Sequence, residues 1–182
     1  MSAHALTLAR LALLAPLVYL LAAGGNFHQW AALVVYAAVC AGGLLDKELA
    51  RRHGGMSPSH AMLDRLCGRL LVVAVVAGLI AAGERGALVF VASLVLIARN
   101  TVIAALGEAL QGRFPIPEGP LEQSQSVLQF LGFSFLIAPS VPLPDAGVES
   151  HVVGAWALIV AALLAVTALA IYGRRAAEGF RS

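Results

Sequence analysis

"LLDKELARRHGGMSPSHAMLDRLCGRLL", residues 44–71, is the one long stretch of this chain that is not suited to a lipid environment. It carries two Asp, one Glu, one Lys, four Arg and two His, and long apolar runs lie on both sides of it. A charged segment between two apolar runs is typical of a connection that joins two membrane helices at the lipid–water interface. The stretch therefore predicts the class of fold and the place where any chemistry would lie.

The composition of the whole chain predicts an integral membrane protein. Of its 182 residues, 60% are hydrophobic and only 12% are charged, with a formal net charge of +2. A soluble domain of this length would expose apolar surface with too few charges to cover it. The two cysteines, Cys40 and Cys67, lie in or beside apolar runs, so we expect buried thiols and no disulfide framework.

The apolar runs predict an all-α fold, a single transmembrane domain over residues 1–182 with six helices. Arg10 is the only basic residue near the start and lies inside the first helical pattern, so we expect a retained span and not a signal peptide. Ser57 and Pro58 predict the N-cap and the first residue of the third helix. The expected spans are 6–23, 29–45, 61–82, 87–110, 124–141 and 151–173.

The basic residues predict the orientation in the membrane. If the N-terminus is cytoplasmic, every lysine and arginine except Arg85 lies on the cytoplasmic side. Cytoplasmic connections carry an excess of Lys and Arg, so this distribution favours that orientation. We therefore expect both termini in the cytoplasm and a motif region, residues 43–68, that faces it. The expected location is the bacterial inner (cytoplasmic) membrane.

The spacing of polar and small residues predicts a pocket between the second and third helices. On each helix these residues recur every three or four positions, which places them on one helical face. Two helices joined by a short connection run antiparallel, so the two faces can look at each other. The two sets are Gly43, Asp46, Lys47 and Ala50 on the second helix, and His60, Asp64 and Gly68 on the third.

This region resembles the motif D-x2-D-G-x2-A-R-x8-G-x3-D-x3-D of the CDP-alcohol phosphatidyltransferase family. Ala50 and Arg51 match the Ala-Arg pair, and Asp46 and Asp64 match the second and third aspartates without a gap. "ALTLARLALLAPLVYLL" is similar to the start of phosphatidylglycerophosphate synthases, where an Asn-Leu-Leu-Thr-x-x-Arg segment leads into the first span. "IARNTVIAAL" resembles the fourth helix of that subgroup. The similarity extends over most of the chain.

The resemblance implies a function and a set of site residues. Family members transfer a phosphatidyl group from CDP-diacylglycerol to an alcohol such as glycerol 3-phosphate and release CMP. The first three aspartates help to hold two Mg²⁺ or Mn²⁺ ions, and the fourth is the base that deprotonates the alcohol. Asp46 and Asp64 would then be metal ligands, Ala50 and Arg51 nucleotide-binding residues, and Arg99 a contact to the acceptor phosphate. The other interpretation of Arg99 is a side chain that reaches the interface.

The chain departs from the motif at four positions. Gly43 and Gly68 stand where the family has its first and fourth aspartates, and Lys47 and His60 replace two glycines. Two divalent cations need several oxygen ligands and compensating negative charge, and only half of the carboxylates remain. The loss of the base at position 68 removes a contribution of about 10²–10⁴-fold. His60 is the alternative base, although it lies two turns before position 68.

A later segment departs as well. In phosphatidylglycerophosphate synthases the fifth helix opens with a Gly-Lys-x-Lys-Thr segment. Here residues 119–129 read "GPLEQSQSVLQ", so the lysines that would bind phosphate are missing.

Two functional hypotheses follow. The first, which we favour, is a member of this family with lost or altered catalysis, in which Asp46, Asp64, Lys47 and Arg51 form a metal-free set of ion pairs. It would bind a lipid or nucleotide, or regulate another membrane protein. The second is an active, metal-dependent transferase, for which a surviving single-metal or nucleotide site would be required. The expected partners are membrane lipid, CDP-diacylglycerol or a CDP-alcohol, and a second copy in a homodimer, with no nucleic acid.

Overall fold

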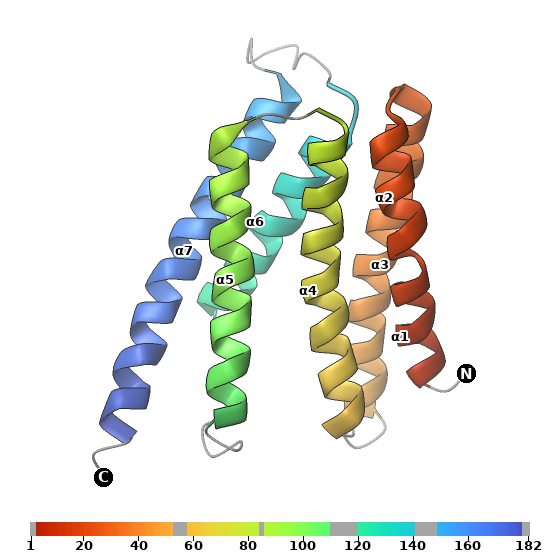
Figure 1. The fold of residues 1–182 in the computed structure, drawn as a ribbon. Coiled ribbons are helices and arrows are strands. Elements are labelled where there is room, and N and C mark those ends of the chain that lie inside the picture. The colour runs from red at the N-terminus through yellow and green to blue at the C-terminus, as the bar shows by residue number, and fades with distance from the viewer. Residues whose placement is uncertain (1–2, 53–57, 84–85, 110–119, 141–148, 180–182) are drawn as a thin grey trace. The chain divides into compact units, whose positions relative to one another are not determined.

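The computed structural model describes residues 3–52, 58–83, 86–109, 120–140 and 149–179 (Figure 1). Inside the helices some side chains also lie outside the description, among them those of Lys47, Ala50, Arg51 and His60. In the described ranges every element is an α-helix, as the sequence predicts.

Each predicted apolar run coincides with helical structure. The helices are α1 (Ala3–Ala12), α2 (Leu14–Ala23), α3 (Asn26–Arg52), α4 (Pro58–Ala81), α5 (Ala87–Ala109), α6 (Pro120–Ile137) and α7 (Ser150–Gly179). The run predicted over 124–141 ends earlier, at Ile137, because the residue before Pro139 is disfavoured in helical conformation. Proline at position 58 is the first residue of α4, as predicted. The predicted cap at Ser57 lies outside the described residues.

The first predicted span is divided into α1 and α2 by a turn at Leu13. Pro16 has no backbone N–H, so it cannot donate the helical hydrogen bond to the carbonyl of Ala12. The helical path continues across the break, because the Leu13 N–H donates to Ala9 O at 3.1 Å and the Leu17 N–H to Leu13 O at 3.2 Å. The break therefore alters the local geometry without ending the apolar stretch.

Three helical stretches in the described residues are long and apolar enough to cross a membrane. They are Leu6–Ala23, Asn26–Asp46 and Ser150–Ile171, judged by length and composition. A shorter apolar stretch covers Ala87–Ile103. An integral membrane protein is therefore supported, while the count of six spans and the orientation of the termini stay predictions.

The chain forms two compact units. The first comprises Met1–Arg85 with Leu136–Val141, and the second Gly86–Phe135 with Pro142–Ser182. Each is described below by itself, and the single domain predicted over residues 1–182 stays a prediction.

In the first unit, α1 and α2 pack against both α3 and α4. Among the described residues, these contacts are far more extensive than those between α3 and α4. A turn at Gly24 and Gly25, with φ of 67° and 84°, reverses the chain so that α3 runs back beside α2 (Figure 1). These φ values suit glycine, which has no Cβ to clash. The first span, not the facing helix, is therefore the main neighbour of α3 and of α4.

A close helix contact in this unit depends on Gly78. A Cβ atom there would lie 2.6 Å from Leu21 Cδ1 and 2.7 Å from Leu21 Cβ. Small residues allow helices to approach closely in membrane proteins, so Gly78 permits α2 and α4 to pack together.

In the second unit, α5 and α7 pack against each other. The helix α6 approaches α7 at Gly132, where a Cβ atom would lie 2.8 Å from Leu158 Cγ and 3.1 Å from the carbonyl oxygen of Gly154. The buried residues of α7 include Ala161, Ala165 and Ala168, which recur at helical spacing and present a smooth, small face.

We expect Gly78→Ala to destabilise the protein by about 1–3 kcal/mol, because the added methyl overpacks the contact with Leu21. The matched control is Gly68→Ala on the same helix, where a Cβ atom meets nothing within 4 Å. The control should keep or raise stability, since alanine favours helix more than glycine does. Thermal unfolding in detergent measures both variants, and equal midpoints would contradict the close α2–α4 contact.

Candidate functional site

Two carboxylates and one guanidinium meet in the first unit. Arg10, on α1, donates from Nη1 to Asp46 Oδ2 at 3.1 Å and to Asp64 Oδ1 at 2.6 Å. Asp46 lies on α3 and Asp64 on α4. A single nitrogen of Arg10 therefore joins three helices through two ion pairs.

Further contacts hold the Arg10 side chain in place. Its Nε donates to the carbonyl oxygen of Val39 at 3.1 Å, and the Thr7 hydroxyl donates to Asp46 Oδ2 at 3.2 Å. Thr7 and Arg10 are three residues apart and share one face of α1. The group is shielded from solvent: Thr7 and Asp46 are fully buried and Arg10 is 6% exposed. The side chain of Asp64, at 12%, is the most accessible member.

The backbone at Gly42 and Gly43 makes room for Arg10. A Cβ atom at Gly43 would lie 2.6 Å from Arg10 Nη2 and 3.1 Å from its Cζ. A Cβ atom at Gly42 would lie 2.9 Å from Arg10 Cδ. The arginine side chain therefore lies directly against α3 at the place where the motif has its first missing aspartate.

The charges of this cluster do not cancel. One guanidinium faces two carboxylates, and Asp46 Oδ1 makes no hydrogen bond with any described residue. Interactions between charges are strong where water is excluded, and a buried charge that loses its partner is costly. Arg10 is therefore essential to keeping two acidic groups in this position.

The predicted meeting of the two motif helices is seen at Asp46 and Asp64, but it is mediated by α1. The sequence analysis predicted that Lys47 and Arg51 form ion pairs with these two aspartates. The side chains of Lys47 and Arg51 lie outside the described residues, so this stays a prediction. The side chains of Ala50 and His60 also lie outside them. Gly68 is exposed, and a Cβ atom there would meet nothing within 4 Å.

Arg99 lies on α5, in the second unit. It is 9% exposed, and its Nη1 donates to the side-chain oxygen of the adjacent Asn100 at 3.1 Å. Gln125 on α6, from the segment that lacks the family's lysines, is also buried. The role predicted for Arg99 on an acceptor phosphate stays a prediction.

Sequence reasoning used Arg10 to identify a retained first span and to orient the chain, and it did not place Arg10 in the site. Two signals point to it. Arg10 is the only Lys, Arg, Asp or Glu before Asp46, and an isolated charge in an apolar helix requires a partner. Thr7 and Arg10 also match the Thr-x-x-Arg part of the N-terminal segment that resembles phosphatidylglycerophosphate synthases.

The described residues do not fit a pair of divalent cations. Both available carboxylates accept hydrogen bonds from Arg10, whose guanidinium is permanently charged and repels a metal ion. Among the residues that the structure describes, no group of three or more His, Cys, Asp or Glu side chains is close enough to hold a metal.

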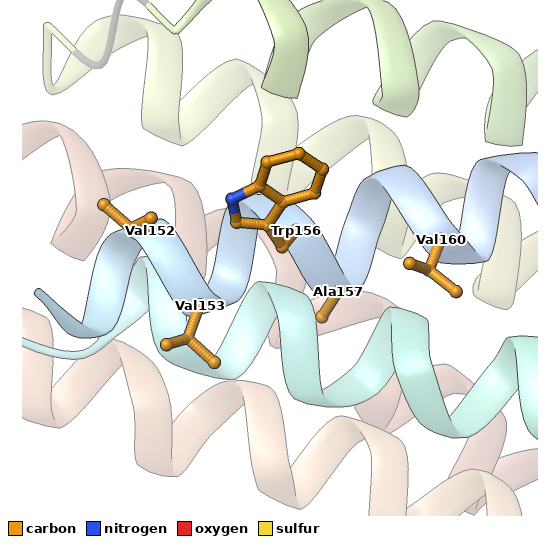
Figure 2. Close-up of a pocket in the computed structure, with 5 residues that line it drawn as sticks. All are labelled: Val152, Val153, Trp156, Ala157 and Val160. Atoms are coloured by element: carbon orange, nitrogen blue, oxygen red, sulfur yellow. The ribbon is translucent and has the colours of Figure 1, made fainter. Parts of the chain in front are cut away.

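A separate hollow on α7 is apolar. It is lined by Val152, Val153, Trp156, Ala157 and Val160, all on α7 (Figure 2). Trp156 is 62% exposed. None of these side chains carries an acid, a base or a nucleophile, so this surface suits contact with lipid tails and not catalysis.

We expect Arg10→Met to destabilise the protein by about 3–5 kcal/mol, because it leaves two buried carboxylates uncompensated. Thermal or denaturant unfolding in detergent measures the loss. The matched control is Arg174→Met on α7, where the arginine is exposed and the change should be within about 0.5 kcal/mol.

The same experiment includes the triple variant Arg10→Met/Asp46→Asn/Asp64→Asn. Removing all three charges leaves none unpaired, so this variant should recover most of the stability that Arg10→Met loses. If the triple variant is less stable than Arg10→Met, the ion pairs do not account for the effect of the single change.

Comparison with known proteins agrees with the resemblance seen in the sequence. A family model described as CDP-alcohol phosphatidyltransferase matches residues 1–169. The match spans most of the chain and includes Arg10, Asp46 and Asp64. Among curated proteins, no significant match is found.

Proposed function

The chain belongs to the CDP-alcohol phosphatidyltransferase family, and from this membership we propose that it keeps the family's membrane fold while its transferase chemistry is lost or altered. In this proposal it is a pseudoenzyme that descends from enzymes of phospholipid biosynthesis. The six spans, the cytoplasmic termini and the location in a bacterial inner membrane are parts of the same proposal.

One observation carries the proposal. The guanidinium of Arg10 binds both surviving motif carboxylates and lies against the backbone of Gly43. Phosphatidyl transfer from a CDP-linked lipid requires neutralisation of the diphosphate, which the family achieves with divalent metals bound to aspartates. Here the aspartates neutralise Arg10 instead.

The second requirement of the reaction, a base for the alcohol, is also unmet at the motif position. Gly68 has no side chain, and the space around its Cα is open. A general base contributes about 10²–10⁴-fold to such a reaction. The proposal therefore combines a metal site that Arg10 occupies with a missing base.

The remaining activity of the protein would be binding. Ala50 and Arg51 keep the motif's nucleotide-side pair, and Arg99 is buried on α5. These residues support recognition of a lipid, of CDP-diacylglycerol or of a CDP-alcohol without turnover. Members of this family are commonly homodimers, so we propose a homodimer that binds a lipid or nucleotide, or another membrane protein.

The second candidate is an active transferase. It is favoured by the convergence of Asp46 and Asp64 on one nitrogen atom, which shows that the two motif helices still present their carboxylates to a common point. In that case the two aspartates would bind Mg²⁺ or Mn²⁺, Arg51 would contact the nucleotide and Arg99 the acceptor phosphate. His60 would be the candidate base.

Release of CMP separates the two candidates. The purified protein is incubated with CDP-diacylglycerol, glycerol 3-phosphate and Mg²⁺ or Mn²⁺, with an active family member as the positive control. We expect no more CMP than from the Asp46→Ala/Asp64→Ala variant. Metal-dependent CMP release by the wild type that disappears in this variant would establish the active transferase.

A further inference from the structure

Arg10 occupies its site in the manner of a bound cation. A single nitrogen, Nη1, lies 3.1 Å from Asp46 Oδ2 and 2.6 Å from Asp64 Oδ1, so one positive centre bridges carboxylates from two helices. The Thr7 hydroxyl also donates to Asp46 Oδ2. This positive centre is covalently part of the chain.

The space that Arg10 uses exists because residue 43 is glycine. A Cβ atom there would lie 2.6 Å from Nη2, closer than Cβ atoms approach other heavy atoms in proteins. The guanidinium is held by the Val39 carbonyl and by two carboxylates, so moving it would cost those hydrogen bonds. An aspartate at position 43 would therefore displace the guanidinium from its present position.

A tethered guanidinium is a strong competitor for a soluble metal ion. Its effective concentration at the carboxylates is in the millimolar range or above, as for other short intramolecular links. Unlike lysine or histidine, arginine does not lose its proton in proteins. Deprotonation therefore cannot remove this cation from the site.

We propose that Arg10 is the resident cation of the motif site, that Gly43 admits it, and that it excludes divalent metals from Asp46 and Asp64. The proposal concerns the binding of cations and goes beyond the loss of catalysis. It predicts that Asp46 and Asp64 bind divalent metal ions when Arg10 is removed. The glycine at position 43, where the resemblance predicts an aspartate, is then what allows Arg10 to reach the two carboxylates.

Binding of Mn²⁺ tests the proposal, by electron paramagnetic resonance on the full-length protein in detergent. The wild type should show no Mn²⁺ binding that depends on Asp46. The variant Arg10→Ala/Gly43→Asp, which removes the cation and adds a carboxylate in the vacated space, should bind Mn²⁺ at least about tenfold more tightly than the wild type. Adding Asp46→Asn to this variant should abolish the gain.

Two matched controls isolate the role of Arg10. Gly43→Asp alone should gain no Mn²⁺ affinity, because Arg10, although displaced from its position against residue 43, stays tethered and pairs with the carboxylates. Arg174→Ala/Gly43→Asp, which removes an exposed arginine of α7, should behave in the same way. Equal gains with and without Arg10 would overturn the proposal.

Removal of Arg10 lowers the expected stability, so a second measurement covers variants that fold poorly. A ligand that binds only the folded state raises the midpoint of thermal unfolding. Millimolar Mn²⁺ should raise Tm of Arg10→Gln and of Arg10→Ala/Gly43→Asp but not of the wild type. Asp46-dependent Mn²⁺ binding by the wild type, or no Mn²⁺-induced rise in Tm for either variant, would overturn the proposal.

Catalysis and cation exclusion have separate readouts. CMP release by the wild type that persists in Asp46→Ala/Asp64→Ala would contradict the loss of catalysis alone, whereas metal-dependent CMP release that needs both aspartates would contradict the exclusion of metal as well. Binding of Mn²⁺ by the wild type without CMP release would contradict the resident cation alone.

Discussion

The double ion pair of Arg10 is the interaction on which the first unit depends. A permanent positive charge inside an apolar helix requires a negatively charged partner. The partners of Arg10 are Asp46 and Asp64, which follow it in the chain by 36 and 54 positions. Satisfying this one group brings α1 into contact with both motif helices. The contacts that α1 and α2 make with both α3 and α4 are consistent with that requirement.

Close approach through glycine serves two purposes in this chain. At Gly78 and Gly132 the absent side chain admits an apolar leucine from a neighbouring helix, which is a packing function. At Gly43 it admits a charged group, Arg10, at a position that the family motif reserves for an acid. The absence of a side chain thus allows close helix packing at Gly78 and Gly132, and it allows a charged group to approach the backbone at Gly43.

Membership in the family and the state of the site are separate properties. The family model matches residues 1–169, and the described residues include apolar helices suited to a membrane, so the chain is a membrane-type member of the family. Function depends on the particular groups at the site and not on the fold. In this chain Gly43 and Gly68 stand where the resemblance predicts acids, while Asp46 and Asp64 are both bound by an arginine from a different helix.

The sequence alone determined the class of the protein, the positions of its helices and the helical faces that carry Asp46 and Asp64, because apolar periodicity and proline placement act locally. The sequence predicted an unbroken first span, and the break at Leu13 near Pro16 was found only in the structure. The sequence did not predict that Arg10 is the partner of the two aspartates. Lys47 and Arg51 are closer to the aspartates in the sequence and were therefore assigned as their partners. Only the tertiary structure places α1 against both motif helices, and that packing decides which cation reaches the buried carboxylates.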